Sequence, residues 1–200
     1  MRHLIIMCAV VAIAAPSLAA PQVGAPAPAF TARDSNGKAV SLAQFRGKTV
    51  VLEWHNPGCP FVKKHYDSAN MQKTQRAALA QGAVWLTVNS GAPGKQGHMD
   101  GAAANALVKT ASAAPTAYIL DQTGAVGKAY AASTTPHMYI VDGRGILTYK
   151  GGIDDKPTAN RADIAGARNH VLAALADMKA GRKVAMADTR SYGCSVKYAG

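Results

Sequence analysis

The stretch that decides the fold is residues 49–64, which read TVVLEWHNPGCPFVKK. It begins with a β-branched and apolar run, residues 49–54, of the kind that forms a buried central strand. The pattern then breaks at residues 55–58, His-Asn-Pro-Gly, and Cys59 comes directly before Pro60. Proline is favoured at the first position of a helix, because its missing N–H would be unpaired there anyway. We therefore predict that a strand leads into a loop and that Cys59 is the N-cap of the following helix.

The chain after Pro60 predicts a strand–helix–strand unit. The helical stretch runs toward Gly82, with a predicted interruption near residues 68–70, and a second buried-strand run follows at residues 83–88. Two strands joined by a crossover helix are parallel in nearly all such units. We therefore expect the strands at residues 49–54 and 83–88 to be parallel neighbours.

The flanking sequence completes an α/β pattern. Residues 30–32 and 39–41 surround Asn36-Gly37, which predicts an N-terminal hairpin. The later elements are a helix over 100–110, a strand over 116–120, a helix over 124–130, a strand over 136–141, a turn at 142–145, a strand over 146–150 and a helix over 163–180. The sequence after Gly181, residues 182–200, has no helical periodicity and reads as an extended tail. We predict a single domain over residues 20–200.

Residues 1–19 have the three-part layout of a secretory signal peptide: a basic start, an apolar run and a small-residue cleavage site at Ala19. The apolar run is too short to span a membrane, and no later stretch is long enough. We therefore expect a periplasmic or secreted protein without a membrane span. Two cysteines, Cys59 and Cys194, remain after cleavage, and an oxidising compartment permits them to form a disulfide.

Composition excludes several classes of protein. Hydrophobic residues make up 48% and charged residues 16% of the 200 residues, which argues against a disordered chain and a polytopic membrane protein. The formal net charge of +11 comes from scattered basic residues, without a basic run or basic-aromatic interleaving, so we expect no nucleic-acid partner. No flavin, nicotinamide or haem motif is visible, and we expect no bound organic cofactor.

Cys59 is the main chemical signal in this sequence. A thiolate is the reactive form of cysteine, and a helix N-terminus favours negative charge, so we expect the pKa of Cys59 to be lowered. Lys63, in the first turn of the same helix, is a candidate to stabilise that thiolate, although a solvated surface role is equally open. The alternative for Cys59 is a buried and inert small residue.

The sequence resembles the thioredoxin-like superfamily, specifically its redoxin branch of peroxiredoxin-like, AhpC/TSA-type proteins. The matching residues are Leu52-Glu53-Trp54, the loop into Cys59-Pro60-Phe61-Val62-Lys63, the Thr135-Pro136 step before a strand, and the hairpin at residues 142–145. The resemblance implies a central mixed β-sheet flanked by helices. It also implies that Pro136 follows a cis peptide bond and lies close to Cys59.

Two departures from the family pattern bear on activity. Val62 stands where a dithiol oxidoreductase has its second cysteine, so local dithiol exchange is impossible. Leu52 and Asn56 stand where a standard peroxiredoxin has its proline and its peroxide-binding threonine or serine. Asn56 is a candidate hydrogen-bond donor in place of that hydroxyl, although asparagine beside Pro-Gly is more often a turn residue.

Cys194, in the tail, is the natural partner for a lone reactive cysteine. If the tail folds back, a sulfenic acid on Cys59 condenses with Cys194, as resolving cysteines do in some peroxiredoxins. A permanent structural disulfide that holds the tail is the first alternative, and it would stabilise the fold by about 5 kcal/mol at most. The second alternative is that the two cysteines never meet.

These observations lead to an exported thiol-dependent oxidoreductase that reduces peroxides or disulfides and is itself reduced by an external thiol protein. Cys59 would attack, and Cys194 would resolve the product. A soft-metal module, a copper carrier for example, is the alternative in a different class, with Cys59 and either His55 or His137 as ligands. A non-catalytic protein with a permanent bridge is the third hypothesis.

Overall fold

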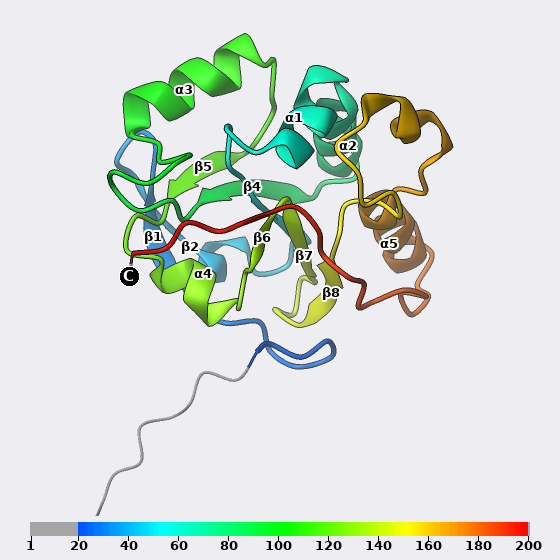
Figure 1. Ribbon diagram of the computed structural model, residues 1–200. Coiled ribbons are helices and arrows are strands. Elements are labelled where there is room, and N and C mark those ends of the chain that lie inside the picture. The colour runs from blue at the N-terminus through cyan, green and yellow to red at the C-terminus, as the bar shows by residue number, and fades with distance from the viewer. Residues whose placement is uncertain (1–19, 200) are drawn as a thin grey trace, which may run out of the picture.

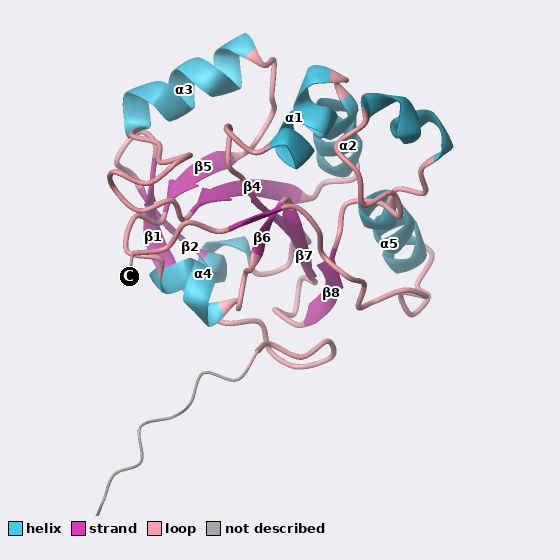
Figure 2. Cartoon of the chain, in the orientation of Figure 1, coloured by secondary structure: helices cyan, strands magenta, loops and turns pink. Residues whose placement is uncertain are grey.

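The computed structural model describes residues 20–199, so the predicted signal peptide, residues 1–19, lies outside the described residues. Helices cover both faces of a central sheet (Figure 2). The α-helices are α1 (Pro60–Asp67), α2 (Asn70–Leu79), α3 (Gly101–Thr110), α4 (Ala125–Ala129) and α5 (His170–Lys179). Short 3₁₀ helices, η1 and η2, cover Leu42–Phe45 and Arg161–Gly166. No helix in the described part of the chain is long and apolar enough to cross a membrane.

Seven strands form the main sheet in the order β2-β1-β5-β4-β3-β7-β8 (Figure 1). They are β1 (Thr31–Asp34), β2 (Ala39–Ser41), β3 (Val50–Trp54), β4 (Val84–Asn89), β5 (Ala117–Leu120), β7 (His137–Val141) and β8 (Leu147–Gly151). β3, β4 and β5 are parallel neighbours, whereas β1, β2, β7 and β8 pair antiparallel. The predicted mixed sheet, N-terminal hairpin and parallel strand pair are confirmed.

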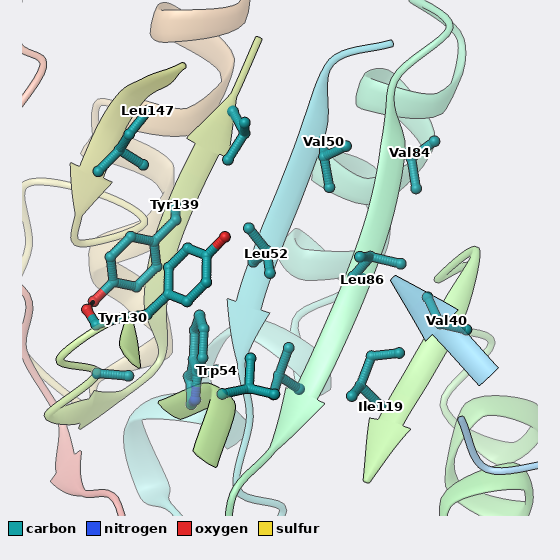
Figure 3. Packing of buried hydrophobic residues seen from close by; sticks show 14 residues of the cluster. Val40, Val50, Leu52, Trp54, Val84, Leu86, Ile119, Tyr130, Tyr139 and Leu147 are labelled. Carbon is teal, nitrogen blue, oxygen red and sulfur yellow. Dashed lines mark hydrogen bonds between the residues drawn. The ribbon is translucent and has the colours of Figure 1, made fainter. Parts of the chain in front are cut away.

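The central strand β3 separates two hydrophobic layers. All five of its residues are buried, and alternate side chains enter opposite layers. One layer contains Leu52 and Trp54 and packs against Tyr130 and Tyr139, as Figure 3 shows. The other layer contains Val51 and includes residues of α2 and α5. The carboxyl end of β3 is therefore held from both sides, which gives the following loop a rigid base.

The structure confirms one predicted helix boundary and corrects another. The predicted interruption near residues 68–70 is confirmed, because Ala69 adopts a left-handed conformation with φ of 59° and separates α1 from α2. The predicted helix over residues 163–180 starts too early, since η2 occupies its first turn. α5 begins only after Asn169, whose side chain accepts a hydrogen bond from the Leu172 N–H at 2.9 Å and caps the helix.

The tail crosses the front of the molecule, from the side of α5 and β8 to the side of α4 (Figure 1, red). Within it, β9 (Cys194–Ser195) pairs antiparallel with β6 (Thr134–Thr135) in a separate two-stranded sheet. Beyond β9, the Val196 N–H donates to Ser133 O at 3.0 Å, and Lys197 O accepts from the Ala92 N–H at 2.9 Å. Backbone hydrogen bonds thus hold the tail against β6, the residue before it and the loop after β4.

Candidate active site

Cys59 lies at the junction between the β3 loop and α1. It is the N-cap of α1, as the sequence predicts, with Pro60 in the first turn. Its N–H donates to Asn56 O at 3.1 Å, which closes the loop, and its own carbonyl accepts from the Lys63 N–H at 2.9 Å. The side chain has no exposed surface. The sulfur is therefore placed by a tight loop on one side and by the first helical turn on the other.

The tail brings Cys194 onto this sulfur. Thr135 and Cys194 are paired residues of β6 and β9, and the peptide bond between Thr135 and Pro136 is cis. The Cys59 thiol donates to Thr135 O at 3.1 Å, while the Cys194 N–H donates to Cys59 Sγ at 3.4 Å. Both cysteines are free thiols in this structure, and Cys194 is the more exposed of the two. Cys59, Pro136 and Cys194 therefore lie together.

The pKa values of the two thiols are shifted in opposite directions. Burial raises the pKa of Cys59, but hydrogen bonds from Cys194, the Val62 N–H and Thr135 outweigh it, so the net pKa is lowered. Three effects raise the pKa of Cys194 to about 11: burial, the hydrogen bond to Cys59 and the negative charge of Cys59. Since the thiolate is the nucleophilic form of cysteine, a lowered pKa favours Cys59 over Cys194 as the nucleophile of the pair.

A close contact at Gly193 fixes the tail beside the site. Gly193 has φ of 130°, and a methyl group on its Cα would overlap the carbonyl oxygen of Thr135. Glycine is thus required immediately before Cys194, both for the backbone conformation and for the approach of the two chains. The glycine lets β9 lie close enough to β6 for the Cys194 N–H to reach Cys59.

Tyr192 anchors the same segment in a buried polar cluster. Its hydroxyl donates to Asp154 Oδ1 and lies 3.2 Å from His65 Nε2. Lys64 Nζ is 3.5 Å from Asp154 Oδ2 and 5.6 Å from the centre of the Tyr192 ring. Its side chain is fully buried, as is that of His65, and burial lowers the pKa of His65 to about 4. The helix position of Lys64 gave no sign of this burial, because a lysine in the first turns of a helix is normally solvated.

Two predicted site residues have other contacts. Asn56 Oδ1 accepts from the Gly58 N–H at 2.9 Å and Asn56 Nδ2 donates to Gln96 at 2.9 Å, so this side chain shapes the loop. The Lys63 side chain is exposed, and the groups that lower the pKa of Cys59 come from the tail, β6 and the helix backbone instead. The expected donor role of Asn56 and thiolate-stabilising role of Lys63 therefore have no contact that supports them.

Both histidines proposed as metal ligands make hydrogen bonds to groups other than Cys59. His55 Nδ1 is 2.8 Å from the Tyr118 hydroxyl, and burial lowers its pKa to about 3. His137 Nδ1 accepts from the Ser133 N–H at 3.4 Å, and burial lowers its pKa to about 4. Across residues 20–199, no three His, Cys, Asp or Glu side chains form a group that could hold a metal ion. This finding concerns groups of three or more ligands, and the two-ligand alternative of Cys59 with His55 or His137 stays a prediction.

Glu53 is a buried acid that the sequence analysis did not single out. It has no exposed surface and accepts hydrogen bonds from Trp85, Thr87, Tyr66 and Gln75, at 2.8–3.3 Å. Burial raises its pKa despite these donors. The available signal was an acidic residue inside an otherwise apolar strand run, because such a residue needs a dedicated set of partners.

The geometry defines a thioredoxin-like redoxin site: a cysteine at the N-terminus of a helix after a central strand, facing a cis-proline loop. The AhpC/TSA family model matches residues 23–150, more than half of the chain, and the protein therefore belongs to the AhpC/TSA family. The family resemblance inferred from the sequence is confirmed. No match to a curated protein sequence was found.

Solved structures share the fold. A hypothetical protein from Sinorhizobium meliloti has a TM-score of 0.75 at 24% identity, covering 91% of this chain and 97% of its own. An uncharacterised conserved protein from Geobacillus kaustophilus has a TM-score of 0.74 at 25% identity, covering 89% and 93%. The thioredoxin domain of a thiol-disulfide oxidoreductase from Bacteroides vulgatus has a TM-score of 0.53 at 22% identity, covering 72% and 96%.

Proposed function

We propose that this protein is an exported thiol-dependent oxidoreductase that cycles between a Cys59–Cys194 dithiol and a disulfide. The observation that carries the proposal is the approach of the tail to the attacking sulfur, with the Cys194 N–H 3.4 Å from Cys59 Sγ. Membership of the AhpC/TSA family supports thiol redox chemistry. The signal-peptide pattern of residues 1–19 supports export to a compartment where disulfides persist.

The oxidative half of the cycle begins at Cys59. With a peroxide, the thiolate attacks one oxygen, the O–O bond breaks, and the alkoxide or hydroxide leaves and takes up a proton, so that Cys59 becomes a sulfenic acid. The Cys194 thiol then attacks this sulfur and water leaves as the disulfide forms. With a disulfide substrate, Cys59 forms a mixed disulfide and Cys194 displaces the substrate thiol. Two electrons pass to the substrate in either case.

The reductive half of the cycle begins at Cys194. A thiolate of an external dithiol attacks the more exposed sulfur, Cys194, and Cys59 leaves. A thiol of lower pKa is the better leaving group, which favours this direction because the pKa of Cys59 is lowered and that of Cys194 is raised. The second thiol of the donor then releases Cys194, so the protein regains both protons and two electrons.

Access to Cys59 requires movement of the tail. The Cys59 side chain has no exposed surface while β9 is paired with β6. A substrate that must contact the sulfur therefore reacts when the segment around Cys194 lifts from Thr135. Pro136 and Thr135 position the sulfur from the other side, through the hydrogen bond to the Thr135 carbonyl.

The proposal is tested by separating the roles of the two cysteines. The mature protein is mixed with hydrogen peroxide, or with a small disulfide, and a dithiol donor, and turnover is followed together with the mass of the intact protein. Cys59→Ser should lose turnover completely. Cys194→Ser should still form one oxidised species at Cys59 but no intramolecular disulfide.

The outcomes distinguish the alternatives. Full turnover by Cys59→Ser would contradict the proposal. A Cys59–Cys194 disulfide that forms but resists excess dithiol would identify a structural bridge instead. A wild-type protein that reacts with disulfides but not with peroxide would restrict the substrate class while retaining the cycle.

A further inference from the structure

A cleft of about 660 Å³ lies beside the two cysteines, between the loop at residues 154–157 and the tail at residues 186–193. We call it the tail cleft. Phe61, two residues after Cys59, and Gly193, next to Cys194, both line it. A molecule held in the tail cleft is therefore adjacent to the redox pair.

Unpartnered polar atoms are concentrated in this cleft. Among the described residues, four buried side-chain polar atoms have no hydrogen-bond partner, and three belong to residues that line the tail cleft. Asp154 Oδ2 is one of them, but it has Lys64 Nζ as an ion-pair partner at 3.5 Å. Thr134 Oγ1 and His170 Nδ1 are the other two. Asp154 and His170 are 3% and 6% exposed. Buried polar groups are normally satisfied, so this clustering points to a ligand that brings hydrogen-bond donors. A carboxylate oxygen can only accept, which excludes an anionic group at this position.

The charges around the cleft favour a cationic donor. Asp154, Asp155 and Asp188 line it, against one guanidinium, Arg190, although the whole chain is strongly basic. Lysines lie near two of these carboxylates, at 3.5 Å from Asp154 and 3.2 Å from Asp188. No lysine or arginine within residues 20–199 forms an ion pair with Asp155, which is exposed. A basic group that enters the cleft therefore meets an uncompensated carboxylate.

The apolar part of the lining indicates a polypeptide. Met186 is 44% exposed and is the one exposed large hydrophobic residue in the part of the chain that the structure describes. It lines the tail cleft together with Phe61 and Pro157. An exposed methionine beside a half-buried phenylalanine, at the edge of a polar cleft, is typical of surfaces that contact other proteins.

We propose that the tail cleft docks a polypeptide segment of the external dithiol reductant, and that this segment carries a lysine or arginine next to its attacking cysteine. The basic side chain lies toward Asp155 and Asp188, and the attacking cysteine lies at Cys194. The inference rests on the proposed redox cycle, and it identifies the kind of partner that the cycle uses.

The experiment uses two synthetic dithiol peptides that differ only in a lysine or a glutamate beside the attacking cysteine. The rate of reduction of the Cys59–Cys194 disulfide is measured for each at low salt. The lysine peptide should reduce the disulfide about tenfold faster than the glutamate peptide. An exposed ion pair contributes up to a factor of about five, and the cleft offers two exposed carboxylates, Asp155 and Asp188. Asp155→Asn with Asp188→Asn should lower this ratio to about two.

The control carries the same change of net charge away from the cleft. Neither Asp67 nor Asp163 lines the tail cleft, so Asp67→Asn with Asp163→Asn should keep the tenfold ratio. A ratio that is unchanged in the cleft variant, or lost equally in the control, would overturn the proposal. Thermal unfolding of each variant establishes that it is folded.

A second measurement separates this inference from the redox cycle. If neither peptide reduces the wild-type protein, binding is measured by fluorescence anisotropy with the variant Cys59→Ser, Cys194→Ser. Tighter binding of the lysine peptide, lost in the cleft variant, would support the docking site although the proposed function had failed. Equal binding of the two peptides would reject the site.

Discussion

Replacing Tyr192 with phenylalanine removes one hydroxyl from the segment that covers Cys59. The hydroxyl donates to Asp154 inside a buried cluster, whereas the ring and its contact with Phe61, at 6.0 Å between ring centres, remain. We expect the substitution to increase the population in which the tail is open. Cys59 should then react faster with an alkylating reagent, because its sulfur has no exposed surface in the closed state.

The magnitude follows from the type of hydrogen bond. A hydrogen bond to a charged group contributes about 1.5–3 kcal/mol, so the loss of about 2 kcal/mol raises the opening equilibrium constant about thirtyfold. Tyr198, on the other side of Cys194, provides the matched comparison. Its hydroxyl donates to a neutral acceptor, Ala132 O, at 2.7 Å. Loss of about 1 kcal/mol there corresponds to about fivefold faster alkylation.

The assay measures the alkylation rate of Cys59 by iodoacetamide in a Cys194→Ser background, where a single thiol of the mature protein reacts. Tyr192→Phe and Tyr198→Phe are compared at one pH, together with the free energy of unfolding of each variant. Equal alkylation rates for wild type and Tyr192→Phe would refute the reasoning. Rates that follow global unfolding alone would also refute it, because opening would then not be local to the tail.

Three further predictions concern the same site. Gly193→Ala should sharply reduce the fraction of protein that forms an intramolecular disulfide after peroxide, measured by intact mass, whereas Gly166→Ala, where a methyl group meets open space, should not. Lys64→Met should lower the free energy of unfolding in urea by about 3–5 kcal/mol, because it leaves the buried Asp154 carboxylate without its cation. Lys63 is exposed, so Lys63→Met should change the free energy of unfolding by less than about 0.5 kcal/mol. A small effect for both lysines would contradict the buried ion pair. Since the pKa of Cys59 is lowered, its alkylation rate should reach half its maximum below the usual value of about 8.5, and a midpoint above that value would count against an activated thiolate.

Much of the fold could be predicted because it depends on short-range patterns. The apolar run of β3, the break before Cys59 and the proline after it indicate strand, loop and helix N-terminus from adjacent residues alone. The start of α5 was less predictable. Ile164 continues the apolar periodicity of that helix, but the capping side chain of Asn169 competes with it and determines where the helix begins.

The candidate site was predictable in its sulfurs but not in its surroundings. A helix-terminal cysteine and a Thr-Pro step are visible in the sequence, and so is a second cysteine near the end. The burial of Lys64 beside Asp154 could not be predicted from the sequence, because a lysine in the first turns of a helix is normally solvated. Glu53 was visible as an acid in an apolar strand, although its four donors come from elements far apart in the chain.

The sequence by itself determined the secondary-structure pattern, the AhpC/TSA resemblance and the choice of Cys59 as the candidate reactive cysteine, since each depends on residues within a few positions of one another. Only the tertiary structure decided that Cys194 lies against Cys59, that the tail buries the sulfur, and that a cleft lined by three aspartates lies beside them. The physical reason is chain separation. A contact across 135 positions depends on how the tail packs between β6, α1 and the loop after β8, and no local pattern encodes that packing.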